Sequence, residues 1–305
     1  MARHTLHGFV FDTTSAIEAR VELLPEYWHL YYDYHRLLLD HGVGVGSFRD
    51  KTVNAKSDYQ HNYWQPSDYN IGDNMKKIGL LGGLSWVSTA EYYRRLNVLM
   101  QLRIGGVASA KITLESLNRQ TYVDAVIERK DEAAACEMIL HACQNLQKAG
   151  ADFIVISCND VHRFVPEIMP EIEIPFLHIA EVTADACVTS GLKKVGLLGV
   201  MKTMEGDFYT DILAKQGVET LIPDAVDRDY IHDRIYDELV LNIFSDATKA
   251  GYLDVIERLS GAGAEGVILG CTEIPLLLQP ADIGIPSFAT TELHCMAAIE
   301  KSLAT

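Results

Sequence analysis

Two short apolar runs in this chain each end at a cysteine that is followed by small or acidic polar residues. The run 152–160 contains Cys158, and the run 265–273 contains Cys271. An unbroken apolar run of this length is typical of a strand that is buried on both faces of a parallel sheet. Because ligands of open α/β sheets bind beyond the carboxyl ends of the strands, both thiols are candidate reactive groups.

Two thiols that face one carbon atom from opposite sides can invert its configuration. One thiolate removes a proton from one face, and the other thiol returns a proton to the opposite face. Each sulfur would then lie about 3 to 3.5 Å from the carbon, with the two sulfurs roughly 6 to 7 Å apart. An unperturbed cysteine is only about 3% thiolate at neutral pH. Since a helix should begin after each strand, we expect its N-terminus to lower the pKa of the thiol.

Both cysteine runs belong to a longer internal repeat. The stretch 76–82 recurs at 193–199, and the stretch 172–175 recurs at 283–286. With the cysteine runs these make three matched pairs in the same order, each separated by roughly 110 to 120 residues. Strand and helix patterns alternate from Met75 to the C-terminus, which predicts two copies of one α/β unit, each with a parallel sheet covered by helices.

The repeat predicts the domain organisation. Residues 1–74 form an N-terminal extension, with a helix over about 15–41 that starts at a capping box and is followed by a linker. Residues 75–180 form the first domain, which is joined by a C-terminal helix over about 290–305, and residues 181–289 form the second. We expect two pseudo-symmetric domains with the active site in the cleft between them.

Composition and charge limit the kinds of partner. The chain has 305 residues and a formal net charge of −16 at pH 7. This charge argues against nucleic acid, because phosphate binding needs a cationic face. No apolar run reaches the roughly 18 to 20 residues of a membrane span, and the N-terminus lacks the layout of a secretory signal. We therefore expect a cytoplasmic protein that does not bind membranes.

The remaining cysteines and the glycine turn admit plainer interpretations. Four cysteines lie in helix-like segments and are expected to be small core residues: Cys136, Cys143, Cys187 and Cys295. Cys158 with His162 lacks the further ligands of a zinc site, so no metal is expected. The turn at Gly82-Gly83 lacks the G-x-G-x-x-G spacing of a dinucleotide site. The backbone amides of residues 82–85 are candidates to bind a substrate carboxylate without any arginine.

From Met75 onward the chain resembles the aspartate/glutamate racemase family of cofactor-independent amino-acid racemases. The resemblance rests on the motifs within residues 78–93, 158–162, 203–209 and 270–273. It implies a two-domain fold with the site between the domains, a small amino-acid substrate, no pyridoxal phosphate, no metal and a homodimer. The extension 1–74 has no counterpart in the family pattern.

The resemblance also implies roles for single residues. Cys158 and Cys271 are the implied acid/base thiols. The candidate substrate contacts are Gly83, Ser85, Asn159, Asp160, Thr203, Tyr209, Thr272 and Glu273.

Asp160 departs from the family pattern, which usually has a threonine at this position. A threonine hydroxyl can donate a hydrogen bond to a carboxylate, whereas an ionised aspartate can only accept. If Asp160 faces the substrate, we expect an amino or neutral group of the substrate there. The alternative is that Asp160 caps the following helix and never touches the substrate.

The predicted function is racemisation of an α-amino acid, of the aspartate or glutamate type, by a two-base thiol mechanism without a cofactor. One alternative keeps the fold and changes the reaction to that of a hydantoin racemase, maleate isomerase or arylmalonate decarboxylase. The other is a non-catalytic protein that binds an acidic amino acid in the same cleft.

Overall fold

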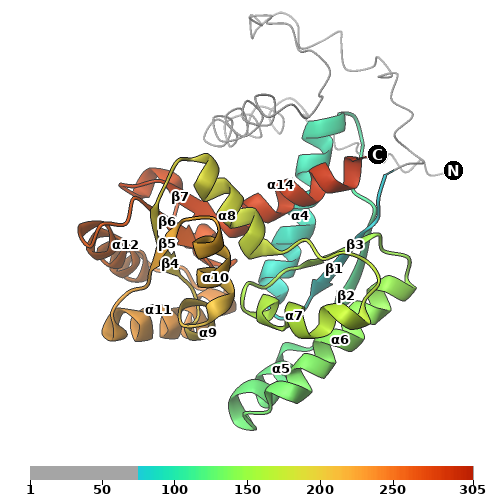
Figure 1. Cartoon of the computed structure of the whole chain (residues 1–305), viewed down its shortest axis with the longest axis horizontal. Coiled ribbons are helices and arrows are strands. Elements are labelled where there is room, and N and C mark those ends of the chain that lie inside the picture. The colour runs from blue at the N-terminus through green and yellow to red at the C-terminus, as the bar shows by residue number, and fades with distance from the viewer. Residues whose placement is uncertain (1–74, 305) are drawn as a thin grey trace, which may run out of the picture. The chain divides into compact units, whose positions relative to one another are not determined.

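The computed structural model describes residues 75–304, all of which belong to one compact unit. It contains two parallel sheets, with strand orders β2-β1-β3 and β5-β4-β6-β7 (Figure 1). The predicted α/β class with parallel sheets is confirmed. The helix and linker predicted for the extension lie outside the described residues. No helix among residues 75–304 is long and apolar enough to cross a membrane.

The first sheet is built from the first copy of the repeat. Its strands are β1 (Ile78–Gly82), β2 (Ile112–Ser116) and β3 (Phe153–Ile156). Side chains alternate along β1 and β3, so Leu81 and Ile154 pack on the side of α6 (Glu132–Lys148), whereas Leu80 and Val155 pack on the side of α4 (Trp86–Ile104). Both faces are therefore apolar, as the unbroken runs predict.

Short helical segments complete this first half of the fold. Between β2 and α6 lie α5 (Arg119–Val123) and one turn of π-helix, Asp124–Glu128. After β3 come a 3₁₀ segment, Asp160–Phe164, then α7 (Val165–Ile168) and a second 3₁₀ turn, Met169–Glu171.

The second sheet is built from the second copy. Its strands are β4 (Lys194–Leu198), β5 (Glu219–Leu221), β6 (Gly266–Leu269) and β7 (Ser287–Ala289). Its helices are α8 (Ile179–Thr189), α9 (Met201–Met204), α10 (Asp207–Lys215), α11 (Ala225–Asp237), α12 (Asp246–Gly261) and α13 (Ile274–Leu277). Two 3₁₀ turns, Leu239–Leu241 and Pro280–Asp282, join them.

The two cysteine runs occupy equivalent places in the two sheets. β3 pairs in parallel with β1, and β6 pairs in parallel with β4. The third repeat differs between the copies: the second copy leads into β7, which pairs with β6, whereas the first makes only an isolated bridge between Ile154 and Phe176. This difference explains why one sheet has an additional strand.

The last helix, α14 (Thr290–Leu303), follows the second sheet in the chain but packs against α4 of the first half and against α8 (Figure 1). Its end is fastened to the start of β1, because the Lys76 amide donates to the Ser302 carbonyl and the Ser302 hydroxyl donates back to Lys76. Cys295 of this helix is buried in the core beside Ile78. The other cysteines predicted to lie in the core are also buried: Cys136, Cys143 and Cys187.

Three buried histidine rings pack against one another near the end of β3. The ring of His162 lies 4.9 Å from that of His178 and 5.6 Å from that of His294, measured between centroids. His294 is held neutral by its hydrogen bonds, since Nε2 donates to the Leu177 carbonyl and Nδ1 accepts from the Tyr92 hydroxyl. Burial lowers the pKa of His178 and of His294 to about 4, and it lowers the pKa of His162 well below its usual value.

These histidines predict a loss of stability in mild acid. In the unfolded chain His178 and His294 each have a pKa of about 6.5 and bind a proton below that pH, whereas the folded protein excludes these protons until about pH 4. The free energy of unfolding should therefore fall as the pH drops from 6.5 toward 4, by up to about 1.4 kcal/mol per pH unit for each histidine. Urea unfolding at a series of pH values measures this slope. His294→Gln should make it shallower, and an unchanged slope would contradict the assignment.

Candidate active site

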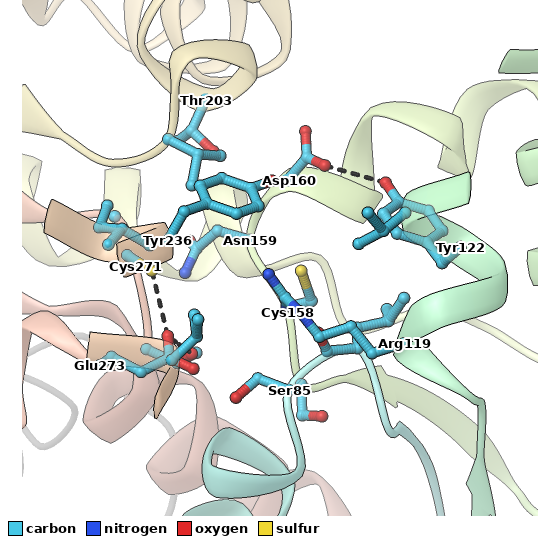
Figure 2. A pocket seen from close by; sticks show the side chains of 18 residues that line it. Ser85, Arg119, Tyr122, Cys158, Asn159, Asp160, Thr203, Tyr236, Cys271 and Glu273 are labelled. Atoms are coloured by element: carbon cyan, nitrogen blue, oxygen red, sulfur yellow. Dashed lines mark hydrogen bonds between the residues drawn. The ribbon is translucent and has the colours of Figure 1, made fainter. Parts of the chain in front are cut away.

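A pocket lies where the carboxyl ends of strands from both sheets come together (Figure 2). Each of β1, β3, β4 and β6 is followed by a loop that contributes to its wall. These loops and the first turns of the helical segments that follow them contribute Leu84, Ser85, Ser157, Cys158, Asn159, Asp160, Val200, Thr203, Gly270, Cys271, Thr272 and Glu273. Helical segments supply the rest of the lining, namely Arg119, Tyr122, Val123, Ile235, Tyr236 and Val240.

The two thiols enter this pocket from different halves of the fold. Figure 2 shows Cys158 on the loop after β3 and Cys271 across from it on the loop after β6. The other predicted site residues also line the pocket, with the exceptions of Gly83 and Tyr209. Whether the lining residues bind a substrate stays a prediction.

Gly83 shapes the first loop and does not face the pocket. Its φ is +84°, and a Cβ added there would lie 2.0 Å from the carbonyl oxygen of Leu117. Its amide donates to the Thr89 hydroxyl at 2.8 Å, so this donor is already used. Ser85 is the N-cap of α4, where its hydroxyl accepts from the Ser88 amide. The turn at Gly83, which only glycine can adopt, thus places Ser85 at the pocket wall.

Cys158 is half-buried, in an environment that disfavours its thiolate. The pKa of the Cys158 thiol is raised to about 12, first by burial and next by the carboxylate of Asp160. The backbone amide of Val161 and the cation of Arg119 act in the opposite direction. The expectation of a lowered pKa is therefore wrong for this thiol in the unliganded protein.

Cys271 has a different carboxylate partner. Its thiol donates to Glu273 Oε2 at 3.1 Å, and the Thr272 hydroxyl donates to the same oxygen at 2.7 Å. Burial raises the pKa of Cys271 well above its usual value, and Glu273 adds to this effect. The reason is the same for both cysteines: each is followed by only a short helical segment, whose dipole is too small to offset burial beside a carboxylate.

Asp160 faces the pocket with its charge already paired. Its Oδ2 accepts from the Tyr122 hydroxyl at 2.9 Å and lies 2.5 Å from Arg163 Nη1. It does not cap the following segment, because the N-cap position belongs to Asn159 and has no side-chain capping bond. The capping alternative is therefore wrong. Pairing with Arg163 also weakens the repulsion that an unpaired aspartate would exert on a carboxylate.

The same arginine belongs to an ionic chain that crosses between the halves. Arg163 Nη2 donates to Glu132 Oε2 at 2.8 Å, and Lys202 Nζ lies 3.0 Å from Glu132 Oε1. Glu132 is on α6 and Lys202 is on α9. The chain therefore joins the first half to the second beside the pocket.

Arg119 is a lining residue that the sequence interpretation missed. It is the one lysine or arginine among the described side chains that line the pocket. Its Nη1 donates to the Leu84 carbonyl, and its guanidinium lies 5.3 Å from the ring centroid of Tyr236. The available signal was its position, three residues beyond the carboxyl end of β2. Tyr236 gave no such signal, because it is one of several residues near the end of a helical pattern on α11.

Comparisons with known proteins agree with this architecture. The family model described as Asp/Glu/Hydantoin racemase matches residues 81–298. The broad specificity amino-acid racemase RacX of Bacillus subtilis is 24% identical over 234 residues, which are 74% of this chain and 98% of that protein.

Solved structures give the same result. A candidate Asp/Glu racemase from Yersinia pestis is 39% identical with a TM-score of 0.70, covering 75% of this chain and all of that one. An aspartate racemase homologue from Pyrococcus horikoshii is 27% identical with a TM-score of 0.65, covering 75% of this chain and 99% of that one. The predicted family is confirmed: the chain belongs to the Asp/Glu/hydantoin racemase family.

Proposed function

We propose that this protein is a cofactor-independent racemase that inverts an α-amino acid by proton transfer between Cys158 and Cys271. The observation that carries the proposal is the position of the two thiols, which line one pocket from equivalent loops of two matching sheets. A pseudo-symmetric pair of thiols suits a reaction whose substrate and product are mirror images. The same symmetry gives no advantage to a decarboxylation that needs one thiol.

The proton balance is simple. For one enantiomer, the Cys158 thiolate takes the α-proton, and the electron pair of the broken C–H bond remains on the substrate as a carbanion delocalised into its carboxylate. Cys271 then gives its own proton to the opposite face of the carbon. The cycle ends with Cys158 as the thiol and Cys271 as the thiolate, so the other enantiomer reacts by the reverse path.

Ionisation of the thiol is expected to accompany substrate binding. Burial raises the pKa of Cys158 and of Cys271. An amino acid brings an ammonium group into this space, and a nearby positive charge favours the thiolate. Cys158 should ionise first, because Arg119 and the Val161 amide oppose the effect of burial there, while Cys271 donates to Glu273.

An acidic amino acid is the substrate that this pocket supports best. The guanidinium of Arg119 is suited to hold one carboxylate. The Ser85 hydroxyl, which lines the same pocket, can donate to a second carboxylate. The carboxylates of Asp160 and Glu273 offer acceptors to the α-ammonium group. The homodimer implied by the resemblance and the cytoplasmic location expected from the sequence stay part of this proposal.

Isotope exchange tests the reaction. In heavy water without added cofactor, L-aspartate and L-glutamate should each be offered to the protein and followed by NMR and chiral chromatography. We expect α-deuterium in the product and equal amounts of both enantiomers at equilibrium. Tight binding by calorimetry with no α-proton exchange would instead favour the non-catalytic alternative, and loss of carbon dioxide would favour a decarboxylase.

A further inference from the structure

The side-chain amide of Asn159, the residue after Cys158, is hydrogen-bonded by residues of α10 and α14. The Tyr209 hydroxyl on α10 donates to Asn159 Oδ1 at 2.6 Å. Asn159 Nδ2 donates to the Thr290 hydroxyl at 3.1 Å, and Thr290 donates to the carbonyl of Leu269 at 2.9 Å. Leu269 is the last residue of β6, two positions before Cys271. A short hydrogen-bonded path therefore joins the two cysteine loops.

The carbonyl of Leu269, at the end of this path, fixes which group donates and which accepts in every bond. The Leu269 carbonyl can only accept, so the proton of the Thr290 hydroxyl is spent on it. Thr290 must then accept from the amide nitrogen of Asn159. The amide oxygen is left to accept from Tyr209, so the opposite orientation of the amide would place two acceptors against each other. The path thus has one arrangement only.

This arrangement differs from the role that the family resemblance implies for Tyr209. Tyr209 and Thr290 are fully buried and do not line the pocket. The hydroxyl proton of Tyr209 is spent on Asn159, which leaves no proton for a substrate. Both ends of the Asn159 amide are bonded across the boundary between the halves. These groups are therefore well placed to join the Cys158 loop to the second half of the protein and poorly placed to bind a ligand.

We propose that Tyr209 and Thr290 are positioning residues, which act through Asn159 to keep Cys158 in register with Cys271. The proposal rests on the two-thiol reaction proposed above. Proton transfer to opposite faces of one carbon requires both sulfurs to lie at reaction distance at the same time, and an error of about 1 Å can cost a hundredfold in rate. Removing a bond of the path loosens one cysteine loop against the other while leaving both thiols in the pocket.

The test compares inversion with exchange in heavy water. For Tyr209→Phe and Thr290→Val, two rates are measured on aspartate: formation of the opposite enantiomer, and uptake of deuterium by the starting enantiomer without inversion. We expect inversion to fall about 10- to 100-fold. We expect exchange to fall much less, because one thiol still removes the α-proton while the other no longer delivers one. The KM should change less than about threefold, since no substrate contact is removed.

Matched variants separate positioning from general damage. Thr290→Ser keeps the hydroxyl and should restore inversion, even if Thr290→Val folds poorly. Tyr252→Phe removes another fully buried hydroxyl of the second half, which donates to Ile231 at 3.1 Å, and it should leave the ratio of exchange to inversion unchanged.

The possible outcomes distinguish this inference from the proposed function. Inversion and exchange that fall in the same proportion, with a raised KM, would overturn the positioning role in favour of substrate contact. Unchanged inversion in both variants would also overturn it. If the wild-type protein exchanges no α-proton from any common amino acid, the proposed function itself fails, and the inference fails with it.

Discussion

Replacing Cys158 with serine is expected to lower racemisation at least about a thousandfold in both directions. A serine hydroxyl is far less acidic than a thiol, so neither its alkoxide nor a comparable proton donor is available near neutral pH. Each inversion uses both groups, one as base and the other as acid, and so the loss does not depend on the starting enantiomer. Initial rates from each enantiomer, followed by chiral chromatography, measure the effect. Cys271→Ser should lose activity to the same degree.

The two serine variants should nevertheless differ in the exchange that they retain. Cys158→Ser keeps the thiol of Cys271, which can remove the α-proton only from the enantiomer whose hydrogen faces it. Cys271→Ser keeps Cys158 and should exchange only the opposite enantiomer. Cys187→Ser is the matched control, because this thiol is buried in the core of α8, away from the pocket. Full racemase activity in either Cys158→Ser or Cys271→Ser would contradict the two-thiol mechanism.

Replacing Arg119 with glutamine is expected to raise the KM for aspartate and glutamate about 30- to 100-fold. This corresponds to about 2 to 3 kcal/mol, the range for a hydrogen bond to a charged group. The change removes the one lysine or arginine among the described lining residues and leaves both thiols in place. We expect a smaller effect on kcat, because the carboxylate is bound in the ground state and in the transition state alike. Steady-state kinetics on both amino acids provide the measurement.

Neutral amino acids reveal which carboxylate Arg119 holds. If it holds the side-chain carboxylate, as we expect, the loss should be confined to acidic substrates and be absent for asparagine and glutamine. An equal loss for all four amino acids would contradict this assignment and would point to the α-carboxylate. Arg94→Gln is the control, since Arg94 is exposed on α4 and pairs with Glu91 outside the pocket.

The parts of the fold that could be predicted depend on local patterns. The apolar runs of β1, β3, β4 and β6 are buried strands because every second residue faces one helical layer and the rest face another. Their repetition along the chain also indicates that Cys158 and Cys271 end equivalent strands. Both features follow from residue type and order, without knowledge of which distant segments meet.

The parts that could not be predicted depend on tertiary contacts. The pKa of Cys158 is raised by burial and by Asp160. Burial depends on distant segments that pack around the thiol, so the sequence next to Cys158 does not reveal it. Tyr209 matches a family motif but does not line the pocket, because its hydroxyl is bonded to the side chain of Asn159. The pairing of Asp160 with Arg163 is the exception. These residues are three apart, a spacing that brings side chains together on one turn of helix, so this contact was within reach of sequence reasoning.

The return of α14 to the first half has a consequence for how the protein is made. Cys295, Ala298 and Ile299 complete the apolar core beside Ile78 and Leu80, yet they are synthesised long after those two residues. While only the first half of the chain has emerged from the ribosome, α14 is missing and this face of β1 and β3 is exposed to water. The loop that carries Cys158 therefore rests on a sheet that reaches its native packing only after α14 has been synthesised. Folding of the first half waits for α14, so the two halves should acquire stability together in one cooperative step.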